Sequence, residues 1–160
     1  MTDSWMYSGL FAIGVLTGLR TLTPIAVFCW MTLLGRVPAN VGWGGFAGNK
    51  IVVGLFTALA FGELIGDKLP KTPSRTSAPG LTARIIFGGL IAAILASSVG
   101  FPEAIGTLLG AVGAVVGTFG GRLVRTRTVA ALKCPDLPIA LIEDAITIGG
   151  SILVCSAFAH

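Results

Sequence analysis

The chain has 160 residues, of which 54% are hydrophobic and 11% are charged, and its mean hydropathy is +0.90. Soluble domains carry roughly a quarter charged residues, so this composition excludes an ordinary soluble protein and predicts an all-α integral membrane protein. At roughly 20 residues for each membrane-crossing helix, the length allows about five spans and leaves no room for a soluble catalytic domain. We therefore expect a single transmembrane domain over residues 1–160.

The net charge of +4 comes from basic residues that lie between the apolar stretches. Such loop charges are the usual orientation signal of membrane proteins, and they do not indicate a nucleic-acid partner. The three cysteines are widely spaced, and no residues have the spacing of a metal site. We expect no metal and no cofactor.

The first predicted span covers residues 7–34 and holds Arg20 within an apolar run. A charge at bilayer depth costs from about 3 to more than 10 kcal/mol, so Arg20 needs an ionic partner or a water-filled cavity. Pro24 follows closely and removes a backbone hydrogen-bond donor. The carbonyl that it frees must be satisfied by a neighbouring helix, by water or by a threonine hydroxyl such as that of Thr21 or Thr23. The span is therefore predicted to be broken or kinked, with Pro24 as a hinge.

The second predicted span begins at Ile51, and Glu63 and Asp67 near its end are four residues apart on one helical face. Two carboxylates in this position can relay a proton or a cation, because their like charge raises the proton affinity of one of them. Lys68 follows Asp67, which favours an interfacial role for that aspartate instead. Glu63 is the sharper candidate for a site.

The remaining predicted spans cover residues 81–99, 104–121 and 138–158. Span 104–121 carries glycines at alternating spacings of four and three residues, which predicts a seam where another helix packs closely. The seam consists of Gly106, Gly110, Gly113, Gly117 and Gly120. The last span holds Glu143 and Asp144 in its first turns, where the helix dipole favours negative charge without any functional role. Either Glu63 or Glu143 is the expected partner of Arg20.

Basic residues gather in segments 67–84 and 121–137, whereas the other side of the predicted bundle has only Arg36 and Lys50. Cytoplasmic loops are enriched in lysine and arginine, so five spans place the N-terminus in the cytoplasm and the C-terminus outside. We expect the inner (plasma) membrane of a bacterial cell as the location.

Two parts of the sequence echo each other, and an odd number of crossings sets them in opposite directions. This combination is typical of an inverted repeat, with spans one and two related to spans four and five. The echo consists of Gly14-x-x-x-Gly18 with Arg20-Thr-x-Thr23 against Gly117-x-x-x-Gly121 with Arg125-Thr-x-Thr128, and of residues 58–63 against 138–143.

The charged segments of the two halves would meet near the middle of such a repeat. We therefore predict a small secondary transporter or channel-like protein for an ion or a small charged solute. Arg20 would neutralise carboxylates or bind an anion, and Glu63 would take and release a proton or a cation. One copy is small for enclosing a path, so a homodimer is plausible. The predicted site consists of Arg20, Thr21, Thr23, Glu63, Asp67, Arg125, Glu143 and Asp144.

The alternative is a structural or lipid-interacting membrane protein, in which ion pairs only hold helices together and basic loops bind anionic headgroups. An enzyme that needs a histidine base is disfavoured, because His160 is the only histidine and the last residue. A membrane enzyme that acts on a lipid through carboxylates is a third reading, and a lateral opening beside Glu63 would favour it.

Three motifs carry a family resemblance: Gly18-Leu-Arg20-Thr-Leu-Thr-Pro24, the segment 62–76, and Leu141-Ile-Glu143-Asp144-Ala145. With these motifs the chain resembles a family of small bacterial multi-pass membrane proteins that is catalogued as a domain of unknown function. The resemblance extends over nearly the whole chain. It implies an integral membrane protein and brings no activity with it.

The segment Glu63-Leu-Ile-Gly-Asp67-Lys68 also resembles the Glu-x-Gly-Asp-Lys-Thr motif of a cation/proton exchanger family. Here an extra residue separates the glutamate from the glycine, and Leu69 replaces the threonine. One inserted residue turns a helix by about 100 degrees. Glu63 and Asp67 therefore have a different relative orientation on the helix than the corresponding residues of that motif.

Overall fold

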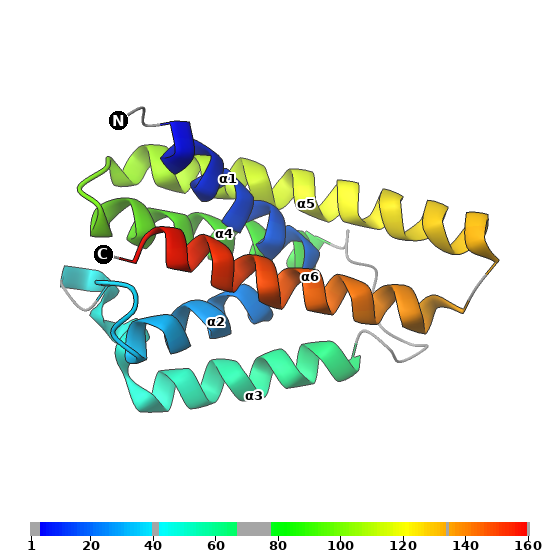
Figure 1. Ribbon diagram of the computed structural model, residues 1–160, viewed down its shortest axis with the longest axis horizontal. Helices are drawn as coiled ribbons and strands as arrows, with labels where there is room; N and C mark the ends of the chain where they lie inside the picture. Colours follow the sequence, from blue (N-terminus) through cyan, green and yellow to red (C-terminus); the bar gives the residue numbers. More distant parts are fainter. Residues whose placement is uncertain (1–3, 40–41, 67–77, 134, 160) are drawn as a thin grey trace.

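A computed structural model describes residues 4–39, 42–66, 78–133 and 135–159, and this part of the chain forms six α-helices and one short 3-10 helix. The prediction of an all-α protein is confirmed. The α-helices are α1 (Ser4–Leu19), α2 (Leu22–Leu33), α3 (Lys50–Gly66), α4 (Ala78–Ser98), α5 (Glu103–Leu132) and α6 (Asp136–Ala157) (Figure 1). The 3-10 helix η1 (Gly42–Gly48) lies between α2 and α3.

Three of the helices, α4, α5 and α6, are long and apolar enough to cross a membrane. They also carry exposed large apolar side chains, among them Ile86, Val116 and Leu153. Water would disfavour such an outer surface, whereas lipid tails are as apolar as these side chains. The structure therefore supports a membrane protein.

The first predicted span, 7–34, is two helices that run in opposite directions (Figure 1). α1 runs parallel to α5, because Phe11 and Val15 lie against Gly113 and Gly117, respectively. The prediction that residues 7–34 form one interrupted span was therefore wrong, because α2 runs in the direction opposite to α1. The chain breaks at Arg20–Thr21 and turns back, so α1 and α2 form a helical hairpin.

The direction of α2 follows from its contacts with α3. The Trp30 indole N–H donates to the Thr57 hydroxyl, and the Leu22 N–H donates to Glu63. The start of α2 therefore lies beside the end of α3, and the two helices are antiparallel. The hairpin leaves the bundle at the end where it entered.

Both ends of the described chain lie at that same end of the bundle. The rings of Trp5 in α1 and Phe158 after α6 pack against each other, with their centroids 5.1 Å apart. The α1–α2 hairpin enters and leaves the bundle at one end, which brings the two ends of the described chain together. This contact favours one side of a membrane for both ends, whereas the sequence predicts opposite sides, and the topology stays a prediction.

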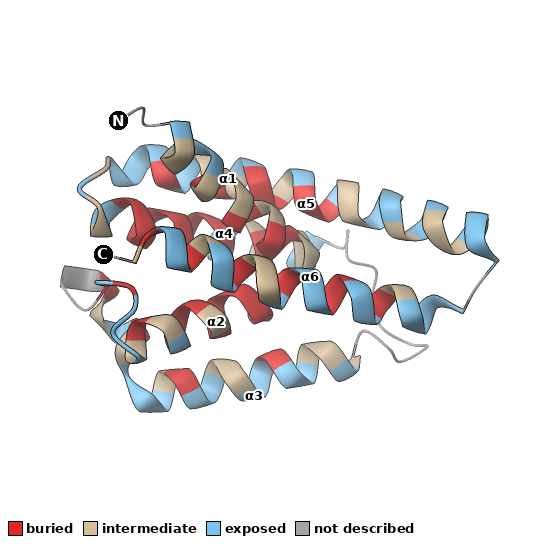
Figure 2. Cartoon of the chain, in the orientation of Figure 1, coloured by how far each residue is buried: buried red, intermediate tan, exposed pale blue. Residues whose placement is uncertain are grey.

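The glycine seam of α5 is confirmed as a packing surface. A methyl group at Gly110 would overlap the Gly88 carbonyl of α4, and one at Gly117 would overlap the Val15 carbonyl of α1. Glycines thus let α5 pack directly against two backbones at once. Gly120, the last of the predicted seam, has nothing within 4 Å of such a methyl. Figure 2 shows the buried residues of α5 confined to its first two thirds.

α5 continues well past the predicted end at residue 121 and stops at Leu132. No glycine or proline follows Gly121 until Pro135, so nothing in this basic segment interrupts the helix. Lys133 then takes a left-handed conformation, with φ 48°, and ends it.

The inverted repeat is not supported by the arrangement of the helices. α1 and α5, which carry the first motif pair, run in the same direction, whereas α3 and α6, which carry the second, run in opposite directions (Figure 1). A single two-fold axis cannot produce both relations.

Candidate functional site at the helix break

The turn between α1 and α2 lies inside the bundle and consists of Arg20 and Thr21. The Arg20 N–H still donates to the Leu16 carbonyl at 3.0 Å and so completes the last turn of α1. The first N–H groups of a helix have no partner within that helix. Thr21 stands at the N-cap of α2, and its side chain makes no capping hydrogen bond. The start of α2 therefore needs an acceptor from elsewhere.

Glu63 of α3 is that acceptor. Its Oε1 accepts the Thr21 N–H at 2.6 Å, and its Oε2 accepts the Leu22 N–H at 2.8 Å. A carboxylate is stabilised at a helix N-terminus, because backbone N–H groups and the helix dipole both favour negative charge there. Glu63 thus caps a different helix and ties α3 to the tip of the α1–α2 hairpin.

Arg20 is fully buried and pairs with Asp144 of α6, with 2.5 Å between Nη2 and Oδ1. The prediction that Arg20 needs an ionic partner is confirmed, and the structure pairs it with Asp144, whereas Glu63 and Glu143 were the expected partners. Asp144 and Glu143 are neighbours on α6, and consecutive helical residues point about 100 degrees apart. One of them faces α1 and the other faces α5.

Glu143 instead accepts a hydrogen bond from Arg125 of α5, at 3.1 Å. The same guanidinium binds Asp136 through two parallel bonds, at 2.8 Å from Nε and 2.5 Å from Nη2. The Arg125 side chain is 14% exposed and that of Asp136 is 57% exposed, so this second cluster reaches the surface. Sequence reasoning missed Asp136, because it ended α5 too early to bring Arg125 opposite the start of α6.

The threonines contribute in different ways. Thr21 acts through its backbone, whereas the buried hydroxyl of Thr23 has no hydrogen-bond partner. Thr23 lines a pocket of about 170 Å³ between α2 and α3, together with Leu64, the neighbour of Glu63. Sequence reasoning missed Thr118 of α5, whose hydroxyl lies 3.3 Å from the Gly18 carbonyl near the end of α1. Its signal was a polar residue inside the glycine seam.

Asp67, the remaining predicted site residue, lies outside the described residues. The structure brings the other seven to one region, in two connected parts. Arg20, Thr21, Thr23, Glu63 and Asp144 surround the helix break, and Arg125 and Glu143 lie beside it toward the bundle end that holds the start of α6. Pro24 lies in the first turn of α2, where a missing N–H costs nothing.

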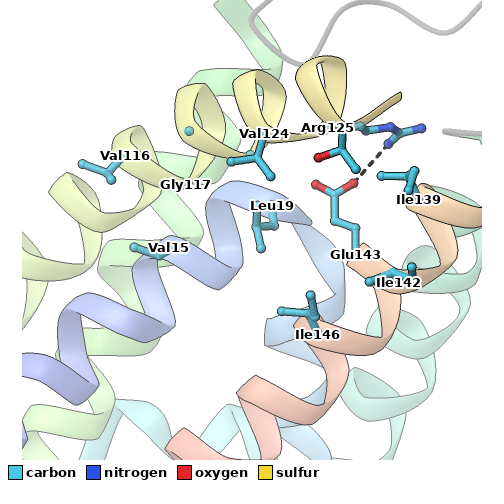
Figure 3. A pocket seen from close by; sticks show the side chains of 13 residues that line it. Val15, Leu19, Val116, Gly117, Val124, Arg125, Ile139, Ile142, Glu143 and Ile146 are labelled. Carbon is cyan, nitrogen blue, oxygen red and sulfur yellow. Dashed lines mark hydrogen bonds and ion pairs between the residues drawn. The ribbon is translucent and has the colours of Figure 1, made fainter. Parts of the chain in front are cut away.

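A second, larger pocket of about 440 Å³ lies between α1, α5 and α6. Figure 3 shows Arg125 and Glu143 facing each other at one side of it, with Val15 and Val116 at the other. Leu19, which precedes Arg20, forms part of its wall. The pocket is therefore an apolar space with charged groups at one end, next to the helix break.

Within residues 4–39, 42–66, 78–133 and 135–159, no group of three or more His, Cys, Asp or Glu side chains is placed to hold a metal ion. Comparison of the chain with family models, with curated proteins and with solved structures gives no match. Fold and site together define a helical protein with candidate membrane spans and a buried set of ion pairs around an interrupted helix pair.

Proposed function

We propose that the protein is a small transporter or channel-like membrane protein and that it binds a small anion at the helix break. One observation carries this proposal: each oxygen of the Glu63 carboxylate accepts one N–H group at the start of α2. A bound anion would be held in the same way, because exposed N–H groups and the helix dipole attract negative charge. Glu63 thus occupies a position suited to a free anion.

Two neighbouring groups support an anion rather than a cation. Arg20 is fully buried at the same turn. The unpartnered Thr23 hydroxyl lies one residue beyond Leu22 and can donate a hydrogen bond. Exchange requires Glu63 to leave, and protonation of its carboxylate favours this because a neutral carboxyl is a weaker acceptor. The mechanism therefore couples uptake of a proton by Glu63 to binding of an anion at the start of α2.

The orientation that we propose places the basic end of the bundle in the cytoplasm of a bacterial cell. Arg122, Arg127 and Lys133 lie at this end, where α5 finishes, whereas Arg36 and Lys50 lie at the other. Lysine and arginine favour the cytoplasmic side, so both termini would be outside. Membership of the family of small bacterial multi-pass membrane proteins, and a homodimer that completes the path, belong to the same proposal.

The test is chemical rescue of Glu63→Ala, with Glu103→Ala near the other end of the bundle as the matched control. Removing Glu63 leaves two partly buried N–H groups without their acceptor, which lowers thermal stability in detergent. Formate, acetate or chloride should then restore stability, since a ligand of the folded state stabilises it by mass action. Exchange of sodium for potassium should have no effect, and Glu103→Ala should show no anion-specific rescue.

Transport is tested with the same anions in liposomes that contain the wild-type protein. The anion that rescues Glu63→Ala best should enter empty vesicles faster as the external pH falls, because Glu63 takes up a proton together with the anion. The alternative, a purely structural protein, is favoured by the partners found for Glu63, Glu143 and Asp144. Absence of both rescue and flux would establish that alternative and overturn the proposal.

A further inference from the structure

The pocket between α1, α5 and α6 opens on the outer surface of the helix bundle. Four of the apolar residues that line it are also substantially exposed, which places its mouth on the faces of α5 and α6 that would contact lipid. These residues are Val116, Val124, Ile142 and Ile146. The volume of about 440 Å³ is within the usual range of ligand pockets, about 300–1,000 Å³.

The chemistry of the walls determines what can fill this space within a membrane. A trapped water molecule needs two to four polar partners, and most of the lining is aliphatic. An empty groove would forfeit the dispersion contacts of every wall atom. A flexible alkyl chain satisfies the walls and is available at every point of a bilayer.

We propose that this pocket holds one acyl chain of an anionic phospholipid, with the lipid phosphate at the Arg125 end. Arg125 and Thr128 line the pocket near the end of α5. The stretch from Gly121 to Lys133 contains four basic residues and no acidic one. Glu143 also lines this end, and Arg125 binds both Glu143 and Asp136. The four basic residues outnumber these two carboxylates, so the end of α5 keeps an excess of positive charge for a phosphate, and the aliphatic walls match its attached chain.

The headgroup, and not the chain, provides selectivity. The acyl chains of different lipids are equally apolar, so the aliphatic walls do not distinguish among lipids. Arginine binds phosphate oxygens well, and basic clusters near a membrane surface attract anionic lipids. Asp136, which shares Arg125, is more than half exposed and can exchange its contact for a phosphate without being buried alone.

This site is separate from the proposed anion site, which depends on Glu63 and the start of α2. The test therefore uses variants that leave the helix break untouched. Gly120→Leu fills the pocket from α5, and a Cβ atom at this position would have nothing within 4 Å. Gly54→Leu on α3 is the matched control, since Gly54 is exposed, has equally open space and does not line the pocket. Val124→Trp is a second way to fill the pocket, should Gly120→Leu fail to fold.

The measurement is native mass spectrometry of purified protein mixed with phosphatidylglycerol or phosphatidylethanolamine. Wild type and Gly54→Leu should retain one phosphatidylglycerol in preference to phosphatidylethanolamine, and Gly120→Leu should lose this adduct. Arg125→Gln should weaken phosphatidylglycerol binding about tenfold, the effect of one charge-assisted hydrogen bond, and should abolish the preference between the two lipids.

Three outcomes would overturn the proposal. Equal retention by wild type, Gly120→Leu and Val124→Trp would place the lipid elsewhere. Retention of both lipids without preference would exclude an anionic headgroup at Arg125. A change in the proportion of monomer and dimer upon filling the pocket, without a change in bound lipid, would make this face a contact between two copies of the chain.

Discussion

Two arginines with nearly the same local sequence have very different surroundings in this protein. Arg20-Thr-Leu-Thr23 stands at the break between α1 and α2, and Arg125-Thr-Arg-Thr128 stands within the unbroken helix α5. Arg20 is fully buried and pairs with Asp144, whereas Arg125 is partly exposed and shares Asp136 and Glu143. The local sequence after the motif differs as well, because Pro24 follows Thr23 whereas no proline follows Thr128 until Pro135.

The glycine motifs that precede these arginines explain the sequence echo in another way. Gly14 and Gly18 of α1 pack against the α5 seam, in which Gly117 lies against Val15. Both helices need small residues at this contact, because their backbones approach directly. The likeness of the two segments thus reflects two parallel helices that pack against each other, and it does not require a repeated fold.

Among the substitutions that test this comparison, the largest loss of stability is expected at Arg20. Arg20→Gln removes the positive charge that pairs with the buried Asp144 carboxylate, which should lower the free energy of unfolding by about 3–5 kcal/mol. Denaturant unfolding in detergent measures this change. The double variant Arg20→Gln/Asp144→Asn should recover much of the loss, because it removes both charges together. A single variant as stable as wild type would contradict the buried pair.

The second largest loss of stability is expected at the glycine contact between α1 and α5. Gly117→Ala places a methyl group into the Val15 carbonyl, so α1 and α5 must move apart at a cost of about 3 kcal/mol. Gly120→Ala is the control, and it should change stability by less than about 1 kcal/mol, in the stabilising direction that helix propensity favours. The two variants are compared by thermal unfolding. Equal losses would show that close packing of α5 is not the reason for its glycines.

Substitution of Arg125 should give the smallest loss of stability of the three. Arg125→Gln should cost about 2 kcal/mol, because Asp136 stays in contact with solvent while Glu143 loses a charge-assisted hydrogen bond. Unfolding at low and high ionic strength separates the two arginines, since salt screens exposed pairs more than buried ones. Salt should therefore reduce the effect of Arg125→Gln and leave that of Arg20→Gln unchanged. Equal sensitivity would remove the distinction between them.

The sequence predicts much of this architecture, because apolar length and interruptions are local properties. The four helices from α3 to α6, the need of Arg20 for a partner and an irregularity before Pro24 all follow from it. The reversal of α2 does not, because a mostly apolar stretch of 28 residues suits either one long span or a short hairpin. The choice of Asp144 over Glu143 depends on how α6 is rotated about its axis, and that rotation is set by packing between helices.

The distance along the chain between Arg20 and Asp144 has a consequence for how the protein is made. More than a hundred residues separate them, so the first hairpin leaves the ribosome long before Asp144 is made. Glu63 is made earlier and can cap α2 while α6 is still missing. The ion pair between Arg20 and Asp144 can form only once α6 has been made, so it belongs to the last stage of assembly.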